Sequence, residues 1–190
     1  MLSLIIGLSL LTIATSANSF FPEFKSRVIK TCGVFVWSKG IEIIVFVGIL
    51  FMLANYSEAK MMSLTLWSPN IVTIYLALIT NFIAIWLLVS GYVSGNIVKI
   101  KVTNPVILGV AFWALAHLIL DGDVLSIILF LFLAFWTILM FKVTTSITQD
   151  NQRHSFKASA STLFLSLMLW IYIIREGYES FAAIGVVITK

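Results

Sequence analysis

A histidine inside an apolar run is the residue whose chemistry stands out in this sequence. His117 lies near the end of the apolar run 105–120, and an ionisable group within such a run is costly in lipid, so it marks a functional candidate. Helical spacing places Gly109, Trp113, His117 and Asp121 along one drifting face. A small residue one helical turn from an aromatic one permits close approach of a neighbouring helix or a flat cofactor, and Asp121 could orient the imidazole.

Two interpretations of His117 follow from this pattern. In the functional interpretation it is a haem or metal ligand, or a carrier of protons. In the structural interpretation it forms a hydrogen bond to another helix close to the membrane interface. The residues alone favour the structural interpretation and leave the functional one open.

Two other polar residues lie inside apolar runs. Glu42 could carry protons, oppose a cation or bind a metal, or it could pair with Lys39 three residues earlier. Asn81 could hydrogen-bond between helices or line a path across the membrane. The structural interpretation is favoured for both. His154 lies beside Arg153 in a polar stretch, where we expect it to be solvated.

Several classes of chemistry find no support in the sequence. It has no glycine-rich phosphate loop, no HExxH, no CxxC and no nucleophile elbow. One cysteine, Cys32, excludes an internal disulfide. Because the sequence holds only this cysteine and two histidines, a zinc site built from protein ligands is implausible. We therefore predict no metal-ion site and assign no catalytic residue.

The composition places these residues in a membrane. Of 190 residues, 61% are hydrophobic and 11% are charged, with a mean hydropathy of +1.08. Soluble domains are about half apolar and about a quarter charged, so lipid must be the solvent. The net charge of +4 does not indicate nucleic acid, because the basic residues are scattered at helix ends. The sequence predicts one membrane-embedded domain, residues 1–190: an all-α polytopic bundle of about six spans, with five to seven compatible.

Turn and breaker residues delimit six spans, which we predict at residues 2–19, 34–55, 70–92, 105–120, 124–143 and 159–174. Pro22 ends the first, and a basic loop follows it. Asn104 and Pro105 have the character of an N-cap and a first helical residue. Gly122 is expected to allow a positive φ in a tight turn, and residues 175–177 to close the last span. The tail to residue 190 is apolar again and could cross once more.

The basic residues predict the orientation. No Lys or Arg precedes the first apolar run, so we expect a span there rather than a cleaved signal peptide. The loops after spans one, three and five hold Lys25, Arg27, Lys30, Lys99, Lys101, Lys142, Arg153 and Lys157. The opposite side holds Lys60, Arg175 and Lys190. The positive-inside rule puts the richer side in the cytoplasm, with both termini in the periplasm.

One segment carries a family resemblance. Residues 104–123, NPVILGVAFWALAHLILDGD, resemble the fourth-span segment of the NnrU family, HP…G…WALAHLLANGD. Weaker matches fall in order along the chain: Gly7-Leu8 with Pro22, Leu66-Trp67-Ser68-Pro69, Gly95-Asn96-Ile97-Val98-Lys99 and Ile184-Gly185-Val186. The resemblance therefore covers essentially the whole chain.

The resemblance implies a multispan protein of the bacterial inner membrane, associated with nitrite and nitric oxide metabolism. The family is similar to ζ-carotene isomerase, a haem b membrane enzyme, and by that analogy His117 would be a haem ligand. Three family histidines are absent here: Thr15, Ile74 and Ser180 stand at or near their places. Haem b would then need five-coordination, ligation by Met61 or Met62, or two copies of His117 from a homodimer.

Three functions are therefore weighed. The first is an accessory factor in nitrite and nitric oxide or respiratory metabolism, with the bilayer and respiratory membrane proteins as partners. The second is a haem b-dependent isomerase of a polyene or isoprenoid, which rests on His117 and an apolar bundle. The third is a small transporter using Glu42 and Asn81. It ranks last, because no inverted repeat of hydropathy is present.

Overall fold

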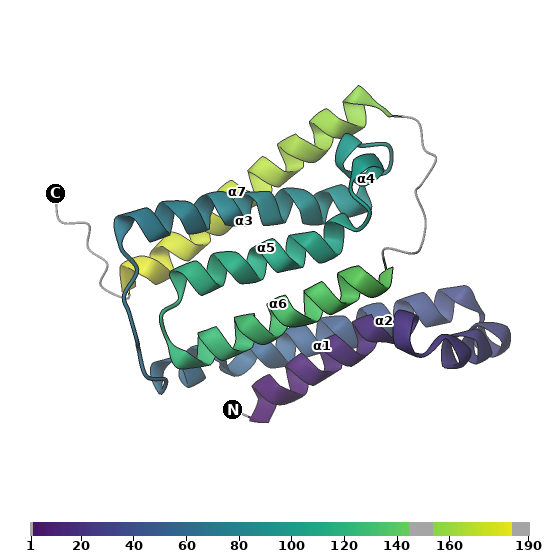
Figure 1. Ribbon diagram of the computed structural model, residues 1–190, viewed down its shortest axis with the longest axis horizontal. Helices are drawn as coiled ribbons and strands as arrows, with labels where there is room; N and C mark the ends of the chain where they lie inside the picture. The colour runs from purple at the N-terminus through teal and green to yellow at the C-terminus, as the bar shows by residue number, and fades with distance from the viewer. Residues whose placement is uncertain (1, 145–153, 184–190) are drawn as a thin grey trace. The chain divides into compact units, whose positions relative to one another are not determined.

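Helices make up nearly all of the described chain. The computed structural model describes residues 2–144 and 154–183. Their helices are α1 (Leu2–Phe20), α2 (Pro22–Met61), α3 (Ile71–Tyr92), α4 (Ile97–Lys101), α5 (Pro105–Leu120), α6 (Val124–Thr144) and α7 (Phe156–Ala183), shown in Figure 1. This confirms the prediction of an all-α chain, and it adds α4, which the sequence had not indicated.

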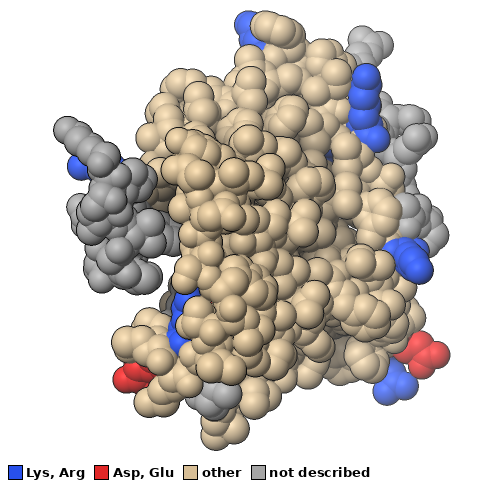
Figure 2. Space-filling model, turned by 60° about the vertical axis from the view of Figure 1, so that its left-hand side comes forward, with Lys and Arg blue, Asp and Glu red and all other residues tan. Residues whose placement is uncertain are grey.

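Length and composition of the helices fit a bilayer. Among the described residues, four stretches are long and apolar enough to cross it: Pro22–Met61, Ile71–Tyr92, Val124–Val143 and Phe156–Arg175. Two apolar helices are shorter, Leu2–Ala17 and Pro105–Leu120. On the face drawn in Figure 2, charged side chains cover only small areas. The chain is thus a multi-span membrane protein with about six spans, as predicted.

The contacts divide the chain into two compact units. Unit 1 is drawn from Met1–Ser68 and Gly122–Phe132. In it α1 packs along α2 through Gly7 and Gly48, where an added Cβ on Gly7 would lie 2.6 Å from the Gly48 carbonyl oxygen. Backbone atoms of two helices can approach this closely only where both lack a side chain, which is the usual packing of small residues in membrane helices.

A short polar pairing closes unit 1. The backbone N–H of Leu66 donates to the Gly122 carbonyl at 2.7 Å, and that of Val124 donates to the Leu64 carbonyl at 3.0 Å. The described glycines with positive φ are Gly33 and Gly95, so the prediction of a positive φ at Gly122 is wrong. A Cβ at Gly122 would lie 1.9 Å from the Trp67 carbonyl oxygen. Glycine is needed there for close approach, not for its backbone freedom.

Unit 2, drawn from Pro69–Asp121 and Leu133–Lys190, is built around α3. Helix α5 packs along one side of α3 and α7 contacts it as well. The α7 contact includes Trp170, whose indole N–H donates to the Leu78 carbonyl at 3.1 Å. Its ring meets Phe82 edge to face, with ring centroids 5.5 Å apart. An indole that is partly buried in a membrane bundle needs such an acceptor, because lipid offers none.

The segment between α3 and α5 is held by one buried amide. Asn96 is 1% exposed, its Nδ2 donates to the carbonyls of Ser90 and Val93, and its Oδ1 accepts from the N–H of Lys99. Gly95 has φ +76°, a conformation that favours glycine. These two residues turn the chain after α3, where the sequence predicted a break, and they start α4.

The predicted loop after span one is helical. Pro22 occupies the first turn of α2, where its missing N–H costs nothing, so it ends α1 and begins the next helix. Helix α2 then includes Lys25, Arg27 and Lys30, bends at Gly33 with φ +88° and ψ 162°, and continues to Met61. The prediction of span two at residues 34–55 was therefore too short at its C-terminal end.

Two further boundary predictions differ from the structure. The predicted N-cap side-chain bond of Asn104 is absent, and its Nδ2 is buried without a partner. Helix α7 continues to Ala183 instead of closing at residues 175–177. One glycine inside a helix costs only about 1 kcal/mol, which tertiary or helical context can offset. The end of the tail, residues 184–190, lies outside the described residues.

Candidate functional site

The last turn of α5 holds the predicted histidine. Pro105 starts this helix, and Asp121 caps its C-terminal end, with the Asp121 N–H donating to the His117 carbonyl at 2.7 Å. The side chains of the same two residues also meet, because Nδ1 of His117 lies 2.9 Å from Oδ2 of Asp121. The Asp121 side chain is 9% exposed and that of His117 is 28% exposed. The carboxylate therefore orients the imidazole from within the same helix.

Trp113 contacts this pair from the preceding turn. Its ring centroid lies 4.9 Å from that of His117, with an interplanar angle of 73°. Spacing on the helix thus brings Trp113, His117 and Asp121 together as predicted. The His117 bond to Asp121 lies within one helix, so it is not the interhelical bond of the structural interpretation. With Nδ1 engaged by the carboxylate, Nε2 is the nitrogen that would bind a metal or exchange a proton.

Gly109, the fourth residue of the predicted face, serves helix packing. A Cβ there would lie 2.8 Å from Cγ of Leu88, 2.9 Å from the Leu88 nitrogen and 3.0 Å from the Ala84 carbonyl oxygen. Helix α3 therefore fills the space above this glycine. Of the two roles the sequence allowed, the structure shows approach of a neighbouring helix at this position.

The other two intramembrane polar residues are Glu42 on α2 and Asn81 on α3. Glu42 forms the predicted ion pair with Lys39, Nζ to Oε2 at 2.6 Å, and the side chains are 58% and 52% exposed on α2. Neutralising each charge within one helix lowers the cost of placing both in lipid. Asn81 is partly buried on α3 in unit 2, and the described residues supply its side chain with no hydrogen-bond partner.

The second histidine lies far from the first. Nε2 of His154 is 3.2 Å from the Ser159 hydroxyl, which accepts a hydrogen bond from the N–H of Ile97 in α4. Helix α4 directly precedes α5 in the chain, whereas His117 lies twelve residues after the start of α5, about 18 Å along it at the rise of an α-helix. His117 and His154 of one chain therefore do not form a bis-histidine pair.

The fit of haem can be judged from these residues. One axial ligand is well provided, since Asp121 holds His117 as carboxylates hold metal-ligating histidines. The described residues contain no group of three or more His, Cys, Asp or Glu side chains that could hold a metal ion. Any second axial ligand would have to be another kind of residue or come from a second copy.

Sequence reasoning missed a polar cluster in unit 1. Asp123 is 4% exposed and caps the N-terminus of α6, accepting from the Ser126 N–H at 2.9 Å and from its hydroxyl at 2.6 Å. The Ser126 hydroxyl is also 2.8 Å from the hydroxyl of Tyr56. Lys60 Nζ lies 3.8 Å from Asp123 Oδ2 and 5.7 Å from the centre of the Tyr56 ring. Asp followed by Ser three residues later was the local signal that could have found this cap.

Together these features define a class of protein: a polytopic helical membrane protein with one carboxylate-oriented histidine in a short span. The family model described as NnrU protein matches residues 3–186. The chain therefore belongs to the NnrU family, as the segment around His117 predicted. No curated protein and no solved structure matches the chain.

Proposed function

We propose that this chain is an accessory protein of nitrite and nitric oxide metabolism in the bacterial inner membrane. Membership of the NnrU family over residues 3–186 is the observation that carries the proposal. The fold supports it, because the described chain consists of membrane helices and short connections and offers a surface to lipid and to other membrane proteins. Respiratory membrane proteins are the partners that this role implies.

A deletion strain tests the accessory role. We expect cells lacking the chain to consume nitrite more slowly under oxygen limitation, and a plasmid copy of the wild-type chain to restore the rate. Aerobic growth without nitrite is the control and should not change. Unchanged nitrite consumption together with unchanged levels of the respiratory reductases would reject the proposal.

A second candidate function is binding of haem b through His117. The observation that favours it is the 2.9 Å contact of Nδ1 with Asp121, which leaves the orientation of the imidazole fixed by a carboxylate. Haem iron would supply a redox-active centre in an apolar bundle, which is the chemistry a polyene or isoprenoid isomerase would use. His117 would be the axial ligand, and Asp121 would hold its ring.

Absorption spectra of the detergent-purified chain test this second candidate. After expression with haem precursor, the wild-type chain should show a Soret band that His117→Ala removes. Asp121→Asn should keep the band but shift the reduced-state peaks, because the ligand loses its carboxylate partner. His154→Ala is the matched control and should leave the spectrum unchanged. A featureless wild-type spectrum would leave His117 with a structural role.

A further inference from the structure

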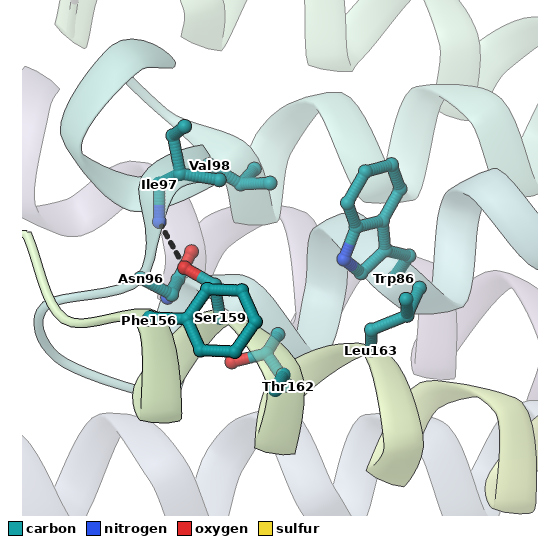
Figure 3. Close-up of a pocket in the computed structure, with 9 residues that line it drawn as sticks. Trp86, Asn96, Ile97, Val98, Phe156, Ser159, Thr162 and Leu163 are labelled. Atoms are coloured by element: carbon teal, nitrogen blue, oxygen red, sulfur yellow. Dashed lines mark hydrogen bonds between the residues drawn. The ribbon is translucent and has the colours of Figure 1, made fainter.

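A pocket lies in unit 2 at the junction of α3, α4 and α7. Its volume is about 260 Å³. The lining residues are Trp86, Asn96, Ile97, Val98, Phe156, Ser159, Ala160, Thr162 and Leu163, drawn in Figure 3. Phe156 and Leu163 at its rim are 80% and 46% exposed, so the pocket opens to the surroundings of the bundle. In a membrane those surroundings are lipid.

The hydroxyl and amide groups that line the pocket are already hydrogen-bonded within the protein, so its interior behaves as an apolar one. The Thr162 hydroxyl donates to the Ala158 carbonyl at 2.7 Å, so its hydrogen bond lies within its own helix. Asn96 is satisfied by three backbone groups, and the Ser159 hydroxyl accepts from the Ile97 N–H at 3.0 Å. The remaining walls are aliphatic and aromatic. An occupant of the interior should therefore be a hydrocarbon, and the volume suits a segment of a chain rather than a whole ligand of ordinary size.

Three lysines adjoin lining residues of the pocket in the sequence. Lys99 directly follows the lining residue Val98, Lys101 is one helical turn beyond Ile97, and Lys157 directly follows Phe156. None of these three lysines pairs with a carboxylate among the described residues. The one carboxylate of unit 2 whose side chain is described, Asp121, lies at the opposite end of α5. The net positive charge carried by these segments therefore favours an anionic group.

One lining residue supplies a donor as well. The indole N–H of Trp86 has no hydrogen-bond partner among the described residues, and in Figure 3 its nitrogen lies on the side of the ring that faces the other labelled residues. The N–H of a partly buried tryptophan usually finds an acceptor. An ester oxygen between a hydrocarbon chain and an anionic headgroup would provide one.

We propose that this pocket binds an anionic glycerophospholipid of the bilayer. An acyl chain lies between α3 and α7, an ester oxygen reaches Trp86, and the phosphate lies among Lys99, Lys101 and Lys157. Basic pockets between membrane helices bind anionic headgroups in this way. The positive-inside prediction puts this end of the bundle in the cytoplasmic leaflet, whose surface is negative. The proposal is independent of the role of His117.

Native mass spectrometry of the full-length chain tests the proposal. In micelles containing phosphatidylglycerol or phosphatidylcholine, the wild-type chain should retain phosphatidylglycerol preferentially. Each lysine near an anionic lipid contributes roughly fivefold in affinity, so Lys99→Ala with Lys101→Ala should weaken binding about 25-fold. The charge-preserving pair Lys99→Arg with Lys101→Arg should retain the lipid. Equal retention of the two lipids would overturn the proposal.

Matched variants separate this pocket from the bulk lipid surface. Arg27→Ala with Lys30→Ala removes two exposed charges of unit 1 and should leave retention unchanged. Ala160→Phe fills the pocket from an exposed position and should abolish the preference, whereas Ser161→Phe, on the exposed neighbour outside the pocket, should not. The binding would be unspecific if the Arg27 and Lys30 variant lost as much lipid as the Lys99 and Lys101 variant, or if Ser161→Phe lost as much as Ala160→Phe. The pocket would then have no such role.

Discussion

Two aspartates separated by one glycine act on different helices. Asp121 ends α5 and orients His117, whereas Asp123 begins α6 and accepts from Ser126. The first was predictable, because a spacing of four on a helix brings side chains together. The second was predictable only as a cap. Its contact with Lys60 joins segments that no local pattern connects, so the buried cluster could not be found from sequence.

At the residue scale, the buried cluster should matter more for stability than an exposed acid does. Asp123→Ala removes an N-cap and leaves the Ser126 hydroxyl and Lys60 with fewer partners, so we expect a loss of about 1–2 kcal/mol in unfolding free energy. Glu58→Ala, at an exposed site on α2, should change it by less than about 0.5 kcal/mol. Unfolding of the purified chain in increasing dodecyl sulfate measures both. Equal losses would contradict the burial of Asp123.

At the scale of elements, the sequence predicted helices well and their connections poorly. Span four was predicted at residues 105–120, which are the bounds of α5, because Pro105 and the aspartate turn mark both ends. The basic segment after Pro22 was predicted as a loop, because three cationic residues within about ten indicate a segment exposed to water. The structure keeps it helical, and a bend at Gly33 separates it from the apolar part of α2. Proline marks a helix start as well as a stop, and charge alone does not decide which.

Helix packing gives a second prediction. Gly109→Leu should lower the thermal unfolding midpoint of the detergent-purified chain, because its Cβ would meet backbone atoms of α3 that cannot move aside. Overpacking of this kind costs about 1–3 kcal/mol, more than the helix propensity gained by replacing glycine. Leu115→Phe, at a residue 45% exposed on the same helix, is the control and should leave the midpoint nearly unchanged. An unaltered midpoint for Gly109→Leu would mean that α5 does not approach α3 this closely.

At the scale of the whole molecule, composition alone predicted a multi-span helical chain, and the structure confirms it. Hydropathy decides which segments enter lipid. Those segments are helical, because unpaired backbone groups are not tolerated there. The sequence could not predict the pairing of residues 64–66 with 122–124 or the pocket beside α4. Both depend on contacts between segments far apart in the chain, on which periodicity carries no information.

Orientation in the bilayer gives a third prediction. The excess of Lys and Arg after spans one, three and five predicts that these loops face the cytoplasm. Alkaline phosphatase, which is active only outside the cytoplasm, should therefore be active when fused after Ser68 and inactive when fused after Thr103. A β-galactosidase fusion at each position should give the opposite pattern. If Ser68 fusions were inactive and Thr103 fusions active, the predicted orientation would be reversed.

The pairing that closes unit 1 also sets an order for biosynthesis. The hydroxyl of Ser63 accepts from the N–H of Leu125, 62 residues further along the chain. At about 5–20 residues per second, the ribosome needs roughly 3–12 s to make that interval. Helices α1 and α2 therefore enter the membrane and wait, with the loop after them unpaired, while α3 and α5 are inserted. A nascent chain arrested just after α5 would hold that loop open, and an insertase or protease would find its exposed backbone there.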